Sequence, residues 1–159
     1  ITSSLPLSAV VGRKDIMNIY PPGSMTSTHS SSPLCVAAAI ANIKEIKKHR
    51  LVERAAELGE ILNPEIERIQ CKYPARLGCF RGKGMVAGIQ VVEPWTKNPD
   101  SRTATAINLR CLHKGLLMFA PVGVGGECLK ISPPLSISEE ALRESIEVFE
   151  EAVDEELLK

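Results

Sequence analysis

A run of hydroxyl side chains, Ser24–Leu34, has the residue types in this chain best suited to chemistry. It reads SMTSTHSSSPL and leads directly into an apolar segment, Pro33–Ile46, that is predicted to be helical. Pro33 suits the first helical position, where a backbone N–H has no intrahelical partner, and Ser32 before it is a good N-cap residue. Hydroxyl groups, backbone donors and a helix N-terminus close together can bind a phosphate dianion. The same residues are also typical of a polar capping loop that binds nothing, and composition alone leaves both interpretations open.

A basic glycine turn is a second candidate for anion binding. It is Arg81-Gly82-Lys83-Gly84, inside the strand-like stretch Leu77–Val92. The turn lacks the full phosphate-loop pattern, so a plain hairpin turn is the preferred interpretation. The histidines, His29, His49 and His113, share no ligand spacing, so no metal site is expected.

The whole-chain composition argues against several classes of partner. Lysine plus arginine balance aspartate plus glutamate at 19 each in 159 residues, whereas a nucleic acid or an anionic membrane would require a basic face. No apolar run approaches the roughly 20 residues of a membrane span, and no signal peptide is recognisable. Five cysteines without a C-x-x-C pair indicate buried, reduced thiols in a cytoplasmic protein. Because the chain begins at Ile1 without a methionine, we expect it to be a fragment.

The elements that would position the hydroxyl run differ in periodicity. Leu5–Gly12 is predicted to be a short buried strand, and Arg13–Tyr20 one or two helical turns ended by Pro21-Pro22-Gly23. Pro33–Ile43 is apolar at almost every position. A helix apolar on all sides must be covered on all sides, so we expect it between layers or at a subunit interface.

The next segment is predicted to be an amphipathic helix with one buried face. Pro64 lies inside it, so a kink or a restart is expected there, with Asn63 as the cap. The apolar residues recur every three or four positions, as in other amphipathic helices: Leu51, Ala55, Leu58, Leu62, Ile66 and Ile69.

The remaining sequence alternates strands and helices. Two strands are expected in Leu77–Val92 and a helix in Ser101–Lys114, after which Leu116–Phe119 and Cys128–Ser132 are predicted to pair as strands. Ser138 is expected to cap a last helix, whose buried stripe is Leu142, Ile146, Phe149, Val153 and Leu157. This order predicts an α/β chain with an α+β C-terminal part, a small sheet covered by amphipathic helices.

Three stretches carry a family resemblance. They are LPLSAVVGRKDIM at Leu5–Met17, STHSSSPLCVAAAIANI at Ser27–Ile43 followed by LVERAAELGEIL, and an ending that contains RGKGMVAGIQ, KGLLMFAPVG and LKISPPLSISEEAL. In order and spacing, over nearly the whole chain, they resemble class III (ornithine/4-aminobutyrate/acetylornithine type) pyridoxal-phosphate aminotransferases. The resemblance implies the C-terminal part of a type I fold, with residues 1–48 ending the large cofactor-binding domain and residues 49–159 forming the small C-terminal α+β domain.

The resemblance also implies roles for individual residues. Thr28 matches the threonine that, in the family, donates its hydroxyl to the cofactor phosphate of the neighbouring subunit, and Ser27 can add a second donor. The family shows glycines and asparagine after this threonine, where this chain has Ser30–Ser32. Lys130 matches a position that commonly carries arginine for the substrate carboxylate, and lysine offers a compact charge instead of a fork. A solvated charge at the end of a strand is the alternative for Lys130.

The resemblance finally implies an activity for the intact parent. The lysine that forms the Schiff base is expected upstream of Ile1, so the fragment alone is expected to be inactive. The parent is expected to bind pyridoxal 5'-phosphate as a homodimer or higher homo-oligomer and to transfer an amino group from an amino acid or ω-amino acid, such as 4-aminobutyrate, to a 2-oxo acid. Because Lys130 replaces arginine, racemisation, decarboxylation or elimination on the same fold stays open. So does a non-catalytic α+β dimerisation or binding module.

Overall fold

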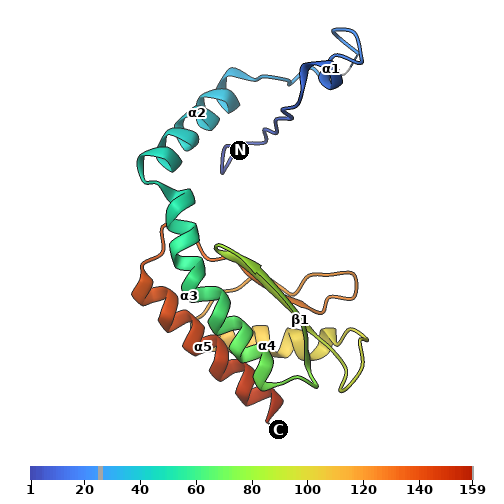
Figure 1. Ribbon diagram of the computed structural model, residues 1–159, viewed down its shortest axis with the longest axis vertical. Coiled ribbons are helices and arrows are strands. Elements are labelled where there is room, and N and C mark those ends of the chain that lie inside the picture. The colour runs from blue at the N-terminus through green and yellow to red at the C-terminus, as the bar shows by residue number, and fades with distance from the viewer. Residues whose placement is uncertain (25–26, 159) are drawn as a thin grey trace. The chain divides into compact units, whose positions relative to one another are not determined.

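The computed structural model describes residues 1–24 and 27–158, which form two compact units (Figure 1). Unit 1 is Ile1–Leu51 and unit 2 is Val52–Lys159. Met25 and Thr26, which belong to the predicted hydroxyl run, lie outside the described residues. None of the helices in the described ranges combines the length and the apolar character that crossing a membrane requires.

The described part of unit 1 contains two helices, α1 (Lys14–Met17) and α2 (Pro33–Lys48). Both were predicted, and α2 begins at the proline as expected. The predicted strand at Leu5–Gly12 is wrong, because no residue of this largely exposed segment belongs to a strand. A strand exists only with a hydrogen-bonded neighbour, and the described part of unit 1 contains none.

Helix α2 is not covered within the described chain. Ala39 is its buried residue, whereas Leu34 is 69% exposed, Ile40 50% and Ile43 41%. The described residues therefore do not supply the cover between layers that was one expectation, whereas cover at a subunit interface, the other, stays a prediction. The apolar pattern of α2 requires a partner surface that the described residues do not supply.

Unit 2 begins with the long helix α3 (Leu51–Lys72), which buries the predicted stripe from Leu58 to Ile69. The expected restart at Pro64 is wrong, because α3 is one continuous helix through this position. Asn63 is not a cap either. Its side-chain Nδ2 donates to the carbonyl oxygens of Gly59 at 2.8 Å and of Gly84 at 3.0 Å. Tertiary contacts along the buried face thus outweigh the local effect of one proline.

A three-stranded antiparallel sheet lies over this helix, in the order β1-β2-β3. The strands are β1 (Leu77–Lys83), β2 (Val86–Val91) and β3 (Cys128–Ile131). The hairpin between β1 and β2 was predicted, but its turn lies at Gly84, so the basic residues before it belong to β1. The predicted pairing of Leu116–Phe119 with β3 is wrong, because β3 pairs with β2 and the 116–119 segment is not a strand.

Helices α4 (Ser101–His113) and α5 (Glu139–Leu157) complete unit 2 (Figure 1). The carboxylate of Asp100 caps α4 by accepting from the N–H of Thr103 at 2.9 Å, and the Ser138 hydroxyl caps α5 as predicted. The helices share one core with the inner face of the sheet, whose fully buried residues include Leu62, Leu77, Ile89, Ile107, Leu129 and Leu142. The fold is therefore α/β, a small sheet covered by amphipathic helices, as expected.

Candidate functional site

The hydroxyl run of unit 1 forms a closed turn held by its own serines. The Ser30 hydroxyl accepts from the Ser27 backbone N–H at 3.2 Å and lies 3.2 Å from the Ser27 hydroxyl. The Ser30 N–H donates to the Ser27 carbonyl at 3.1 Å. Thr28 lies inside this turn with an exposed side chain, and its hydroxyl has no hydrogen bond among the described residues. The turn therefore presents one open alcohol to the surface.

The N-terminus of α2 follows this turn and is itself uncapped. Ser32 stands at the N-cap position, yet its side chain makes no capping bond, and Pro33 occupies the first turn. The first turn carries no acidic residue that would neutralise the helix dipole. Ser31, at a φ of 57°, adopts the left-handed conformation and bends the chain toward this end. Open backbone donors beside an open alcohol suit a phosphate.

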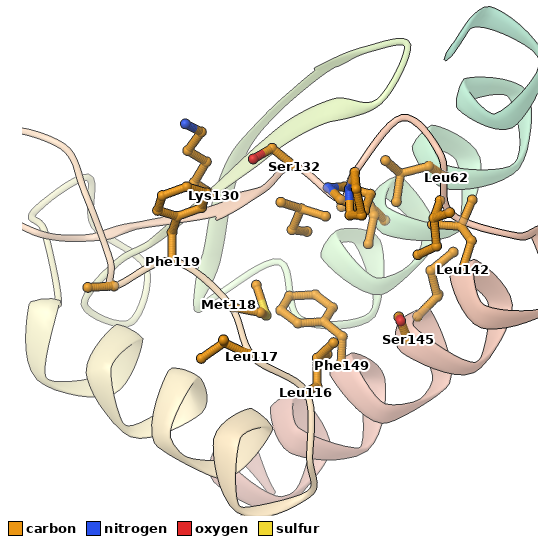
Figure 2. A pocket seen from close by; sticks show the side chains of 17 residues that line it. Leu62, Leu116, Leu117, Met118, Phe119, Lys130, Ser132, Leu142, Ser145 and Phe149 are labelled. Carbon is orange, nitrogen blue, oxygen red and sulfur yellow. The ribbon is translucent and has the colours of Figure 1, made fainter. Parts of the chain in front are cut away.

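Lys130 lies on the edge strand β3 of unit 2. Its partner across the ladder is Gly88, and the partner of Gly88 on β1 is Arg81, so these residues share the sheet face opposite the core. The Lys130 Nζ lies 4.6 Å from the centre of the Phe119 ring. Figure 2 labels both side chains. No ion pair in the described ranges includes Lys130, so its charge is held by an aromatic face instead of a carboxylate.

An apolar pocket of about 570 Å³ opens beside this pair (Figure 2). Its walls come from α3, from the segment Leu116–Ala120, from β3 with the prolines that follow it, and from α5. The polar side chains in the wall besides Lys130 are Ser132 and Ser145, and the Ser145 hydroxyl already donates to the Ala141 carbonyl at 2.7 Å. The lining of the pocket is therefore suited to hydrocarbon.

The predicted site residues lie in different units. Ser27 and Thr28 share one turn of unit 1, whereas Lys130 belongs to unit 2. Phe119 was missed because its stretch was interpreted as a paired strand. The available signal was the alternation of Leu116–Phe119, in which Leu116 and Met118 face the core while Leu117 and Phe119 are exposed.

Metal-ligating side chains do not cluster in the described part of the chain, and its most buried thiol, Cys111, has a raised pKa. The described part contains no group of three or more His, Cys, Asp or Glu side chains that could hold a metal ion. Burial raises the pKa of the Cys111 thiol to about 11, which makes it unreactive. The expectation of buried thiols is wrong for Cys71 and Cys79, which are exposed, although the described cysteines are free.

Comparison with known proteins identifies the family. The family model described as Aminotransferase class-III matches residues 1–153. The chain belongs to the class III aminotransferases. A solved structure of this family, acetylornithine aminotransferase from Elizabethkingia anophelis, superposes with a TM-score of 0.73 at 32% identity, over 89% of this chain and 33% of that one. The family assignment expected from the three sequence stretches is confirmed.

Two curated relatives show the range of activities among similar proteins. The probable 4-aminobutyrate aminotransferase of Bacillus subtilis is 33% identical over 151 residues, which cover 94% of this chain and 34% of the relative. The alanine/serine racemase of Pyrococcus horikoshii is 31% identical over 157 residues, which cover 99% of this chain and 32% of the relative. This class III chain thus spans about a third of the length of the curated relatives it matches.

Proposed function

We propose that the protein containing this chain is a pyridoxal-phosphate-dependent aminotransferase. It moves an amino group from an amino acid or ω-amino acid, of the 4-aminobutyrate type, to a 2-oxo acid. Family membership supports the reaction class, and the name of the Bacillus subtilis relative supports the donor class. The observation that carries the proposal for this chain is the open Thr28 alcohol beside the uncapped N-terminus of α2.

The residues of unit 1 fit the phosphate group of the cofactor. Thr28 donates its hydroxyl to a phosphate oxygen, Ser27 donates from the same turn, and the first backbone N–H groups of α2 face the anion with the positive end of the helix dipole. When bound, the cofactor withdraws electrons from the substrate Cα. In this proposal residues 1–48 end the large cofactor-binding domain and residues 49–159 form the small domain.

Lys130 binds the acid end of the substrate in this proposal. Its ammonium lies over the Phe119 ring and has no carboxylate partner among the described residues, so a substrate carboxylate can take that place. A lysine contributes a compact charge that accepts several directions of approach, whereas an arginine would fix one planar geometry. This favours a substrate with a mobile carboxylate on a flexible chain, as in an ω-amino acid.

The oligomeric state follows from the same arrangement. The apolar side chains of α2, among them Leu34, Ile40 and Ile43, are exposed next to the phosphate turn. A second subunit that covers them brings its own cofactor toward Thr28, so the protein is a homodimer or a higher homo-oligomer with the phosphate shared between subunits. Exposed apolar helices adjoining a binding residue are typical of such interfaces.

Replacement of Thr28 by valine in the full-length protein tests the phosphate contact. Valine keeps the shape and removes the donor, so we expect cofactor affinity to fall by about 1–2 kcal/mol, roughly fivefold to thirtyfold. The dissociation constant of pyridoxal 5'-phosphate, measured by fluorescence titration, checks this. Thr28→Ser keeps the hydroxyl and is the matched control. An unchanged dissociation constant for Thr28→Val would remove Thr28 from the site.

Racemisation is a second candidate function. The similarity to the Pyrococcus horikoshii racemase, together with a lysine at position 130, favours it. Incubation of the full-length protein with one enantiomer of alanine separates the candidates. Inversion without a 2-oxo acid supports the racemase, whereas amino transfer that requires a 2-oxo acid supports the aminotransferase. A protein that binds no cofactor would support the non-catalytic module.

A further inference from the structure

The apolar pocket of unit 2 opens directly onto the hydrophobic core. Its wall includes core residues of α3 and α5 that are at most 2% exposed: Leu62, Ile66, Leu142 and Phe149. The rest of the wall comes from the segment Leu116–Ala120 and from β3 with the prolines that follow it. Figure 2 shows side chains from both helices and from both of these segments around the same space. Among the described residues, the core of unit 2 is therefore open on this side.

The mouth of the pocket is apolar as well. Leu117 and Phe119, which belong to its wall, are 83% and 59% exposed. The Ser145 hydroxyl in the wall already donates to the Ala141 carbonyl at 2.7 Å, so it offers no free proton to a ligand or to water. A volume of about 570 Å³ lined in this way gives water few hydrogen bonds, whereas apolar side chains gain by leaving water for it. The lining therefore favours an occupant that inserts apolar side chains.

The origin of those side chains is argued from the length of the relatives and from the depth of the pocket. This chain spans about a third of the length of the curated relatives it matches, so a protein of their length has most of its sequence outside it. A pocket whose floor is the core itself is normally filled by the same polypeptide, because a domain forms one closed core. A second copy has a different proposed contact, the exposed apolar side chains of α2 in unit 1.

We propose that the apolar pocket is the docking site of an apolar segment of the same polypeptide, from the part of the full-length protein that this chain does not span. The segment inserts its side chains between α3, α5 and the Leu116–Ala120 segment and closes the core of unit 2. This inference goes beyond the proposed function and uses neither the cofactor nor the substrate. It requires only a protein of the length of its relatives.

Photo-cross-linking in the full-length protein identifies the occupant. p-Benzoylphenylalanine in place of Leu117 is irradiated at the mouth of the pocket, and mass spectrometry of the digest identifies the peptide that it joins. We expect a peptide of the same polypeptide from outside these 159 residues. The same photoreactive residue in place of Val86, which is 55% exposed and does not belong to the pocket wall, is the matched control and should not join that peptide.

Protein assembled from isotope-labelled and unlabelled subunits separates the possible occupants. A cross-link from position 117 within one polypeptide, to a peptide outside the 159 residues, supports the proposal. A cross-link between a labelled and an unlabelled subunit would place a second copy in the pocket. A cross-link confined to the 159 residues, or none at all, would show that the pocket is open. Each of these last three results would overturn the proposal.

A larger side chain in the pocket wall tests its occupancy independently. Ser145 belongs to the wall on the α5 side, where Figure 2 labels it. In an occupied pocket Ser145→Phe overpacks the core, so we expect Tm of the full-length protein to fall by about 2–4 °C relative to Ser145→Ala, which adds no volume. In an open pocket the ring would instead cover apolar wall, and a Tm that stays the same or rises would contradict the proposal.

Discussion

Two glycines decide how closely α3 approaches the hairpin turn. A Cβ atom added at Gly59 would lie 2.6 Å from the Cα of Gly84, which is backbone and cannot move aside like a flexible side chain. Gly84 in turn has a φ of 54°, and a Cβ there would meet the Ala55 carbonyl oxygen at 3.3 Å. Because both positions lack a side chain, helix and turn are in direct backbone contact.

We expect Gly59→Ala to destabilise the protein by about 1–3 kcal/mol, the usual cost of overpacking. In an exposed helix the same change would stabilise by about 1 kcal/mol, so the sign of the effect is diagnostic. The free energy of unfolding from urea titration checks it. Glu60→Ala, at an exposed position of the same helix, is the control and should be nearly neutral. A Gly59→Ala protein as stable as the control would contradict the close approach.

Residue-level chemistry was only partly predictable from the sequence. The hydroxyl run could be proposed from residue type and from its place before a helix, which are local properties, whereas the choice of Ser27 and Thr28 within it came from the family resemblance. The role of Asn63 could not be predicted in this way, because its hydrogen bonds to the carbonyl oxygens of Gly59 and Gly84 depend on where the hairpin lies. The contact of Phe119 with Lys130 depends equally on the path of a segment that is distant along the chain.

Ion pairs and hydrogen bonds connect helices α3 and α5. The Arg68 Nη1 donates to a Glu150 oxygen at 2.9 Å, and the Lys72 Nζ bridges Glu150 at 3.2 Å and Asp154 at 2.8 Å. The Tyr73 hydroxyl also donates to Asp154, at 2.7 Å. The hydrogen bond from Arg68, followed by the one from Lys72, lowers the pKa of Glu150 to about 2, although burial opposes the shift. The ionised carboxylate thus connects the two helices.

The lowered pKa of Glu150 predicts acid sensitivity. Because the folded value of about 2 lies below the unfolded value, this group stabilises the fold above the unfolded pKa and loses that contribution as pH falls toward 2. We expect this contribution to the free energy of unfolding to be about 1–2 kcal/mol. This is less than the energy equivalent of the full pKa shift, because Arg68 and Lys72 are half exposed and solvent screens their charges. Unfolding measured between pH 7 and pH 2 should show the loss.

Glu150→Gln should flatten this part of the pH profile and lower stability at pH 7. Glu147→Gln is the control, because Glu147 is exposed on the same helix and has no ion pair among the described residues. If Glu150→Gln has the same pH profile as the unmodified protein, the acid sensitivity comes from other carboxylates.

At the level of elements, helices were easier to predict than strands for a physical reason. The helices α2, α4 and α5 follow from local sequence patterns and, for α5, from the Ser138 cap, which neighbouring residues determine. Strand pairing is non-local and cannot be seen in the composition of one segment. The apolar stretch Leu116–Phe119 was therefore predicted to be a strand, whereas β3 pairs with β2. Leu5–Gly12 likewise has strand composition without a neighbour.

The two units differ in how much of their apolar surface is buried. Unit 2 has a continuous core shared by its sheet and helices. Unit 1 instead leaves apolar side chains exposed on both sides of the Ser27–Ser30 turn, among them Val10, Val11, Leu34 and Ile40. Since exposed apolar area of this kind favours association, unit 1 is the part of the molecule where the proposed subunit interface belongs.

Ile40→Asp tests that interface in the full-length protein. Ile40 lies in the middle of α2 and is 50% exposed, so an aspartate is tolerated where water reaches it and unfavourable where a second subunit buries it. We expect the dimer to weaken at least tenfold, because burial of one isoleucine contributes about 1.5–3 kcal/mol. Sedimentation velocity over a range of concentrations measures the change. Lys47→Asp introduces the same carboxylate in the polar last turn of α2 and should leave the dimer intact. If Ile40→Asp dimerises as tightly as that control, the exposed face of α2 lies outside the interface.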